Sequence, residues 1–487
     1  MVSPQLLIAK QIAAKLEVVE GTSPGSFTAA DALQRVIQPS IAVTPFEASR
    51  DFARASFTHP PKVLASDSGV QSARCQTTFG VELAGHSSGL GTAPLWSKYL
   101  KASGFREEQL KTLTIGAITN GDAVFLHGET VTGGTSTETA TVVSDTHNGT
   151  TTLYIARDSG TFDVGGEVLT GSVSGCVATT TAASQVAAQG WGWWPVTIPT
   201  KKMTVSSGSA TQAVGDILIG DTSGARARFV ESALAADTSI YLRLLDGTFT
   251  DGEAVSSNGA GGGAYTATGG TPILAADHIP TLTFQAYMDG QIMGIVGNRG
   301  TVSFTFEHGK PAIANFDFQG VWASVSDGAN LTLGTYPAKV PPVFRGAQFT
   351  LNDGTLSHAN ARFNSLAIDM ASAAVVRDNS NKATGLQSCV IDGREPSLTF
   401  NPDKIDEAVY PFYDNWLNGT TARASWRLGS TSGNKIEFRA PATQFSGIAE
   451  GTRDQRQILD ATAMLTGGLQ VSSTVVGGDN ELVLLLV

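Results

Sequence analysis

Residues 297–307 read Gly-Asn-Arg-Gly-Thr-Val-Ser-Phe-Thr-Phe-Glu, and polar and apolar side chains alternate without a break from Thr301 to Glu307. Side chains of a β-strand point alternately to its two faces, so this pattern predicts a strand that buries Val302, Phe304 and Phe306 together. A helix would instead place its apolar residues three or four positions apart. The stretch therefore predicts a β-sheet with one face buried in the core.

The same alternation returns in three other segments of the C-terminal half. Residues 281–289 alternate and then reach Asp289-Gly290, a pair that favours a tight hairpin turn. A second segment centres on Phe316 and Phe318, and a third spans residues 423–428. The apolar residues predicted to line core faces are Leu282, Phe284, Ala286, Met288, Phe316, Phe318, Ala424, Trp426 and Leu428. These strands predict a mainly β core.

Two helices are expected beside the strands. One covers Ala93–Ala102, with Thr92 as its N-cap and Gly104 ending it. The other covers Asp403–Leu417, and Pro411 would kink or end it. The apolar stripes predicted to dock on the sheet are Leu95, Trp96, Tyr99 and Leu100 in the first helix and Ile405, Val409, Phe412 and Trp416 in the second.

Residues 116–270 differ from the rest because they are rich in Gly, Ser and Thr and repeat themselves. Gly128–Gly133 (GETVTG) returns 87 residues later as Gly215–Gly220 (GDILIG), and Gly166–Gly171 (GEVLTG) is an echo inside the first copy. Such a period predicts duplicated strand–turn–strand units, with glycines where a turn needs positive φ. We expect two inserted β-repeats, at 116–190 and 206–270.

The inserted repeats divide the chain into parts. Residues 1–115 and 271–487 are expected to form one discontinuous core domain, and residues 191–205 a Trp-rich linker between the repeats. Trp191, Trp193 and Trp194 would anchor this linker to the main body, since large aromatic side chains favour burial at interfaces.

Composition excludes several classes of protein. Among 487 residues only 15% are charged, while 54 are glycine, which suits many short strands joined by turns. The net charge is −11 and no basic stripe is present, so the chain does not look like one that grips nucleic acid by its phosphates. Cys75, Cys176 and Cys389 lie far apart and predict neither a disulfide framework nor a zinc site.

The ends of the chain carry no strong targeting pattern. The apolar run at residues 6–9 stops at Lys10, too early for the apolar region of a signal peptide. The scattered cysteines lead us to expect synthesis in a reducing cytoplasm. The run Leu482–Val487 is far too short to span a bilayer and predicts a closing strand.

One motif suggests catalysis. Gly85-His-Ser-Ser-Gly89 fits the Gly-x-Ser-x-Gly pattern in which a serine nucleophile sits on a strand–turn–helix elbow. Gly91 and Pro94 follow too closely for a helix to start after Ser87, so we expect a polar loop instead. The histidines lack metal-ligand spacing, and the acidic residues of the repeats resemble calcium ligands only loosely: Asp216, Asp221 and Asp251. No catalytic, cofactor-binding or metal-binding residue is predicted.

Short motifs occur in a fixed order along the two outer parts of the chain. They are Lys15–Glu17, Glu20–Thr22, Ala29–Ala32, Val81–Gly85, Gly91–Pro94, Ala102–Phe105, Tyr287–Gly290, Gly297–Val302, Phe316–Gly320, Gly429–Asn434, Ala440-Pro441 and Asn480–Val483. In order and spacing, this set resembles the tail tube (major tail) proteins of long-tailed, non-contractile bacteriophages and related gene-transfer particles. A minimal tube protein lacks residues 116–270, which we therefore expect to be an outward-facing decoration.

The resemblance implies a β-sandwich or barrel core with one or two flanking helices. Such subunits would form stacked, hexameric rings around a channel through which DNA is ejected, without enzymatic activity or cofactor. The implied partners are other copies of the chain, tape-measure protein, tail terminator and distal tail proteins, and double-stranded DNA that passes without specific binding. The protein would reside in the virion tail, with no insertion into a membrane.

A long polar segment at 46–78 is a candidate arm that reaches the next ring, because loops of this length are usually functional or flexible. Its candidate contact residues are Phe46, Arg50, Arg54, Pro60, Pro61 and Lys62.

Two alternative functions stay open from sequence. In the first, the chain is a decoration or adhesion protein of a capsid or tail, and the repeats bind sugar or host surface. In the second, it is a secreted β-rich hydrolase built around Ser87.

Overall fold

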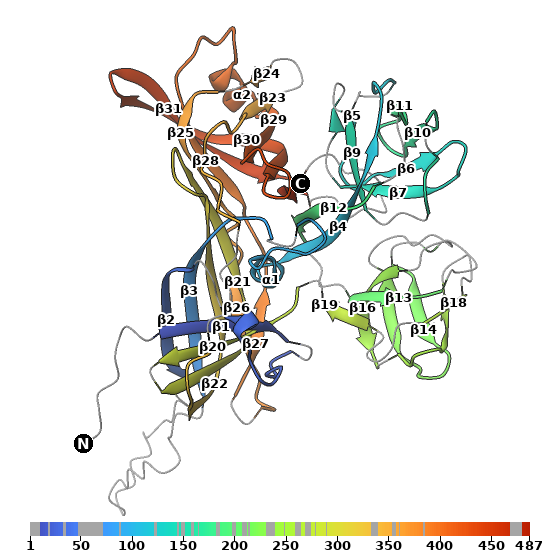
Figure 1. The fold of residues 1–487 in the computed structure, drawn as a ribbon, viewed down its shortest axis with the longest axis vertical. Coiled ribbons are helices and arrows are strands. Elements are labelled where there is room, and N and C mark those ends of the chain that lie inside the picture. Colours follow the sequence, from blue (N-terminus) through green and yellow to red (C-terminus); the bar gives the residue numbers. More distant parts are fainter. Residues whose placement is uncertain are drawn as a thin grey trace, which may run out of the picture.

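The computed structural model is mainly β, as the sequence predicts, and its two α-helices are short. It describes residues 10–487 apart from 18–19, 33–35, 47–71, 87–88, 121–123, 144–145, 148–150, 157–159, 164, 182–185, 197–200, 207–211, 213–214, 230–238, 248, 259–263, 268–273, 278, 289, 333–338, 353–356, 360, 383–384 and 468–479. The core runs along the long axis of the molecule, and the inserted repeats lie to one side of it (Figure 1). None of the helices in the described part of the chain has the length and apolar character that crossing a bilayer requires.

Eight strands of the core pair antiparallel, each with the next. In spatial order they are β2 (Val36–Phe46), β3 (Ser72–Glu82), β22 (Ile313–Asp327), β21 (Gln291–Glu307), β25 (Phe363–Asp369), β28 (Ser397–Pro402), β31 (Arg456–Thr466) and β30 (Ile436–Arg453). A row of paired, buried side chains crosses seven of them: Val81, Ala314, Phe304, Ile368, Leu398, Ala463 and Phe445. One face of the sheet is therefore a continuous core.

The alternating stretch behaves as predicted. Val302, Phe304 and Phe306 are fully buried, while Thr301 and Ser303 face the other side and stay partly accessible. β20 (Leu282–Met288) pairs with β21, and Gly290 turns the chain between Met288 and Gln291 with φ +94°. The hairpin turn predicted at 289–290 is thus confirmed.

The core contains the same strand path twice. The first path is β2–β3–β22–β21–β20, and the second is β25–β28–β31–β30–β29, where β29 spans Thr421–Leu428. A short helix follows the second strand of each path: α1 (Ser97–Ala102) after β3 and α2 (Phe412–Asn418) after β28. Both helices lead into a glycine of positive φ, Gly104 and Gly419. The two halves join where β21 pairs with β25.

Both helix predictions were too long. α1 begins at Ser97 after Trp96, not at Thr92, and Leu95 points out with 40% of its surface exposed. α2 begins after Pro411, because proline fits a helix start better than its interior. Val409 and Trp416 are exposed rather than docked, whereas Phe412 is buried.

The remaining core strands complete the body. They are β1 (Lys10–Leu16), β4 (Phe105–Thr114), β12 (Val186–Pro195), β23 (Thr350–Asn352), β24 (Ser357–Ala359), β26 (Ala374–Asp378), β27 (Leu386–Ile391) and β32 (Val483–Leu486), with a 3-10 turn at Ala29–Asp31. β32 pairs with β12 and β30, which confirms the predicted closing strand.

Two further hydrophobic clusters belong to the inserted repeats. One lies among β5 (Val124–Phe125), β6 (Thr130–Gly133), β7 (Thr139–Val142), β8 (Thr146–His147), β9 (Thr152–Ala156), β10 (Val168–Gly171) and β11 (Val177–Thr179). The other lies within the sheet of β13 (Lys201–Thr204), β14 (Ile217–Gly220), β15 (Arg226–Phe229), β16 (Ser239–Asp246), β17 (Ala254–Ser257), β18 (Ala264–Thr266) and β19 (Leu274–Asp277). The second repeat thus has its own small core, whereas the cluster of the first repeat also includes Leu113 of β4.

Candidate assembly surfaces

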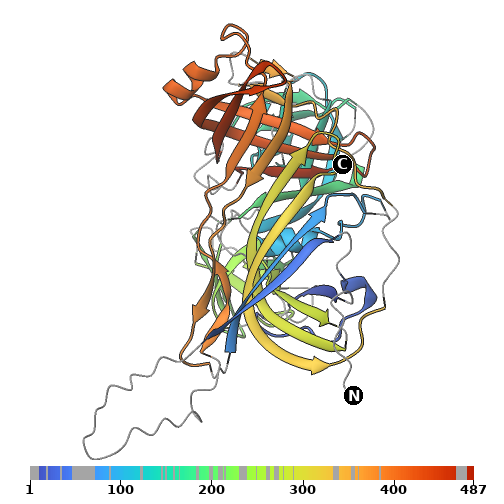
Figure 2. The ribbon, with the colours of Figure 1, turned by 90° about the vertical axis from the view of Figure 1, so that its left-hand side faces the viewer.

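The sheet face opposite the core is mostly polar, and the β26–β27 hairpin covers part of it by packing Val376, Leu386 and Cys389 against Val321 of β22. Figure 2 shows this face toward the viewer, with β21 and β22 in front and the inserted repeats behind. Strand pairing aligns small polar residues across it, as in the row Asn315, Ser303, Asp369 and Ser397. The acidic residues on this face include Glu82, Asp317, Asp369, Asp460 and Glu307, and Arg74 on the same face pairs with Asp378. These carboxylates give a largely hydroxyl- and amide-lined surface a negative character.

The two ends of the eight-strand path are open. Among the described strands, β2 pairs only with β3, and Val43 on β2 is 45% exposed although it lies beside buried Cys75. At the other end, residues 446–453 of β30 pair with β31 alone, because the pairing of β30 with β29 ends at Gln444. Unpaired strand edges invite pairing with another chain.

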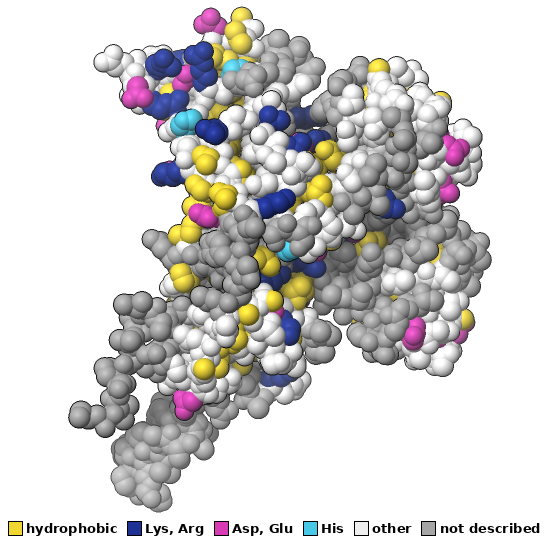
Figure 3. Space-filling view, viewed as in Figure 1, with side chains coloured by type: hydrophobic (Ala, Val, Ile, Leu, Met, Phe, Trp, Pro, Cys, Tyr) yellow, Lys and Arg dark blue, Asp and Glu magenta, His cyan; other side chains and the backbone are white. Residues whose placement is uncertain are grey.

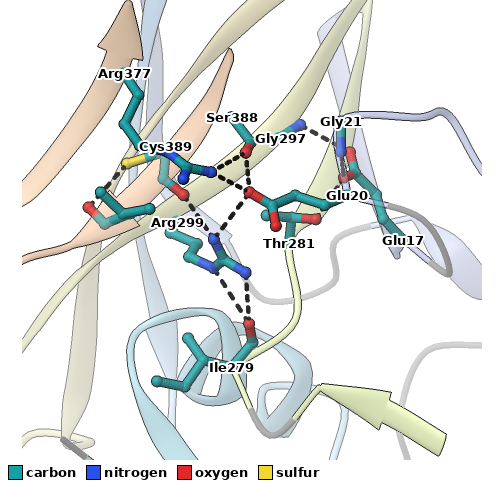
Figure 4. A network of polar contacts seen from close by, with 11 residues as sticks. Glu17, Glu20, Gly21, Ile279, Thr281, Gly297, Arg299, Arg377, Ser388 and Cys389 are labelled. Carbon is teal, nitrogen blue, oxygen red and sulfur yellow. Dashed lines mark hydrogen bonds and ion pairs between the residues drawn. The ribbon is translucent and has the colours of Figure 1, made fainter. Parts of the chain in front are cut away.

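A buried network ties the N-terminal motifs to the central hairpin (Figure 4). The Arg299 guanidinium donates to Ile279 O at 3.0 and 3.2 Å and to Cys389 O at 2.7 Å, and lies 3.4 Å from a Glu20 carboxylate oxygen. The Glu17 carboxylate accepts hydrogen bonds from the backbone N–H of Gly297 at 2.8 Å and of Gly21 at 2.6 Å. Glu17 and Glu20 of the N-terminal segment therefore hold Gly297 and Arg299 of β21 in place.

In each inserted repeat, a buried glutamate accepts hydrogen bonds from a serine in a distant loop of the same repeat. The Glu129 carboxylate accepts the backbone N–H of Ser174 at 3.0 Å and its hydroxyl at 2.9 Å. Glu253 does the same with Ser223, at 2.9 and 2.8 Å. Burial opposes ionisation of Glu253, but hydrogen bonds from Ser223, Thr250 and Thr222 outweigh it and hold the pKa of its carboxyl below the ordinary value.

The second glycine of each Gly-x-x-x-x-Gly motif leaves room for the glutamate–serine contact and does not form a turn. Only the first one has positive φ, for example +83° at Gly128. A Cβ added to Gly133 would lie 2.2 Å from a Glu167 oxygen, and one on Gly220 would lie 2.4 Å from the Ser223 hydroxyl. The prediction that both glycines supply turn positions was therefore wrong for the second one.

Equivalent tyrosines, 87 residues apart, lie against the core in both repeats. Tyr241 donates its hydroxyl to Glu108 at 2.7 Å, and the Arg106 guanidinium stacks 3.9 Å from its ring centre. Burial raises the pKa of Tyr154 to about 12, with Glu437 raising it further and Arg439 lowering it. Tyr241 therefore docks the second repeat on the Arg106–Glu108 pair of β4, whereas the first repeat joins the same strand through the pairing of β9 with β4.

The three tryptophans lie within β12, which pairs with β4 and β32. Trp193 is fully buried, packs 4.7 Å from the Trp96 ring and donates its indole N–H to Ser97 at 3.1 Å. Trp191 donates to Leu90 O at 2.9 Å. They belong to the core sheet that separates the two repeats.

A basic pocket of about 390 Å³ was not predicted. Figure 3 shows Lys and Arg side chains gathered at the end of the core that carries β25 and β31. Asp403 pairs there with Arg453 at 2.6 Å and with Arg456 at 3.7 Å. The pocket is lined by these three and by Arg345, Arg362, His308, Phe344, Phe349 and Phe363, among others. Arginines from three separate segments meet in it, which no local sequence pattern reveals.

The other candidate residues do not form a site. Phe46 ends β2 opposite Ser72, while Arg50, Arg54, Pro60, Pro61 and Lys62 lie outside the described residues. Ser87 also lies outside them, and the next helix starts only at Ser97, so no strand–turn–helix elbow forms after it.

The acidic residues of the repeats do not converge. Asp221 accepts a hydrogen bond from the Ser256 hydroxyl at 2.8 Å. In the part of the chain that the structure describes, no group of three or more His, Cys, Asp or Glu side chains could hold a metal ion. Cys75, Cys176 and Cys389 are free and buried.

Comparison with known proteins adds no family to this picture: no family model matches the chain, and no curated protein matches it.

Proposed function

We propose that this chain is the tail tube protein of a long, non-contractile bacteriophage-type tail, where it polymerises as stacked rings around a channel for DNA. One observation carries the proposal. Eight strands form a single antiparallel path with a continuous core on one side and a mostly polar face on the other, which the β26–β27 hairpin covers only over part of β21 and β22; among the described strands, each end of the path has an open edge.

Such a sheet is suited to a wall. A lone open sheet risks uncontrolled pairing at its edges, and closure into a ring of copies satisfies them. The width of a barrel grows with its number of strands, so a ring that takes eight strands from each copy encloses a wide lumen.

The part of this face that β26–β27 leaves uncovered has the chemistry of a lumen. It offers hydroxyls, amides and the carboxylates of Asp317, Asp369 and Asp460, which repel phosphates rather than bind them. Salt screens charges over about 8–10 Å, so DNA would feel this repulsion only close to the wall. The inserted repeats lie behind the sheet in Figure 2, which supports the proposal that they decorate the outside.

Electron microscopy of the purified protein tests the proposal. We expect hollow tubes of uniform width with a regular ring repeat. A decoration or adhesion protein would instead bind pre-formed particles and give no tubes, and a solid rod or a stable monomer at high concentration would contradict the proposal. The resemblance adds tape-measure, terminator and distal tail proteins as the expected partners of such tubes.

A further inference from the structure

The two halves of the core join through β21 and β25, and we propose that neighbouring copies join in the same way through β30 and β2, so that three chains close each ring. The inference rests on the proposed tube function and specifies the partner surface and the number of copies.

The junction inside the chain supplies the template. The first part of β21 pairs with β20, and its last part, residues 303–307, pairs antiparallel with β25. Phe304 lies opposite Ile368 on the core side, and Ser303 lies opposite Asp369 on the polar side. The core cluster includes both Phe304 and Ile368, so it runs across the junction without a break.

Strand edges equivalent to those of β21 and β25 occur at the two ends of the eight-strand path, where the described residues provide no partner strand. β30 occupies in the second path the place of β21, and its last part, 446–453, has a free edge among the described strands. β2 occupies in the first path the place of β25, and it also has a free edge. Antiparallel pairing of β30 with β2 of the next copy would repeat the internal junction.

Side chains at the two edges fit this pairing. On the core side, Val43 is half exposed beside Cys75, and Ile448 packs only partly against the core cluster. On the polar side, both edges carry a small exposed residue, Ala42 and Ala449. Burial of the apolar pair and close approach of the small pair would extend both faces of the sheet into the next copy.

The internal repeat sets the number of chains. A ring of six equivalent units, which the resemblance implies, needs six copies when a chain holds one unit. This chain holds the strand path twice, so three chains supply six units. Three copies of eight paired strands make a closed wall of 24 strands.

Mass per ring, measured on tubes of the full chain by electron microscopy, tests the count. We expect three chains per ring. Tubes with six chains per ring would overturn this inference and leave the tube function standing. Absence of any ring or tube would overturn the proposed function and this inference together.

Cross-linking tests the surfaces. Ala42→Cys is combined in one chain with Ala449→Cys, or with Ser446→Cys to sample the register, while the native cysteines stay buried. Oxidised tubes should give a covalent ladder that ends at three chains on a non-reducing gel. A mixture of the two single variants should stop at two chains. Tubes that form without any cross-link in either double variant would overturn the edge pairing.

A charge at the junction gives a third test. Val43→Lys would bury an ammonium between copies, and we expect a folded chain that forms no rings. Val168→Lys, at a similarly exposed valine of the first repeat, is the matched control and should form tubes. Circular dichroism verifies that both variants fold, and normal tubes from folded Val43→Lys would contradict the inference.

Discussion

The Glu167 carboxylate reaches across the first inserted repeat to Ser136, whose backbone N–H and hydroxyl donate to the same oxygen at 2.7 and 2.6 Å. Glu129 makes the reverse contact with Ser174, so the two halves of the repeat exchange their glutamates. The second repeat has the equivalent contact from Glu253 to Ser223. The glutamate of each Gly-Glu motif therefore accepts hydrogen bonds from a loop of the other half of the repeat.

Removing the glutamate carboxylate of one repeat should destabilise that repeat alone. Glu167→Gln leaves a neutral side chain in place of a carboxylate that accepts the N–H groups of Thr135, Ser136 and Asp163. We expect a loss of about 2 kcal/mol, because charge-assisted hydrogen bonds to buried donors are lost. Hydrogen exchange should accelerate in residues 124–179 and not in 203–267. Glu253→Gln is the matched control with the opposite pattern, and equal effects on both repeats would contradict the assignment.

The glycine that ends the motif should not tolerate a methyl group. Gly133→Ala places Cβ 2.2 Å from Glu167 Oε1, so the carboxylate must move and its hydrogen bonds stretch. We expect about 2 kcal/mol of destabilisation from this overpacking, measured by thermal unfolding. Gly91→Ala is the control, because its Cβ would meet nothing within 4 Å. An unchanged melting temperature for Gly133→Ala would show that the loop adapts freely.

Acid should weaken the core through Glu437 on β30. Burial opposes ionisation of this carboxyl, but Arg439 and Lys435 outweigh it and lower its pKa to about 2. A lowered folded-state pKa gives stability that is present above the ordinary value of 4.5 and is lost as the pH falls toward 2. The shift corresponds to about 3 kcal/mol at neutral pH. Denaturant titrations should show Glu437→Gln less stable than the parent at pH 7 and nearly equal to it near pH 2.

The stability that Arg299 contributes should depend on the shape of its guanidinium as well as on its charge. Arg299→Lys keeps the charge but cannot reach Ile279 O and Cys389 O together, because it lacks the planar fork. We expect a loss of about 2 kcal/mol for Arg299→Lys and about 4 kcal/mol for Arg299→Met, which also leaves the buried acceptors unpaired. Chemical denaturation measures both. An Arg299→Lys variant as stable as the parent would show that the fork contributes nothing beyond charge.

The sequence predicted strands better than helices, for a physical reason. Period-two alternation at 301–307 survives in the fold because one face of the sheet is fully buried and the other is not. The helix stripes failed at Leu95 and Val409, since α1 and α2 have only six and seven residues and the flanking apolar residues face solvent. Local patterns of that length do not distinguish a helix from the loop before it.

Sequence also missed what depends on distant partners. The repeat motif was visible, but the role of its glutamate was not, because Ser136 and Glu167 meet only after the two halves pair. The doubled strand path was missed as well. It lies in the order of pairing between strands far apart in the chain, and β28 and β3 share no evident motif. Long-range register is set by the whole core and not by any one segment.

Deletion of the decoration must spare β12. Removing 116–270 as one block would also remove Trp191–Trp194, and with them the strand that pairs with β4 and β32. Separate deletions of 117–181 and of 201–273, each bridged by a short Gly-Ser linker, keep β12 and the buried contact of Trp193 with Ser97. We expect tubes of normal ring repeat and smaller outer diameter, because each repeat forms a hydrophobic cluster separate from the main core cluster. Block deletion of 116–270 is the contrasting variant and should misassemble. If either separate deletion abolished tubes while the chain remained folded, the repeats would be part of the wall and not a decoration on it.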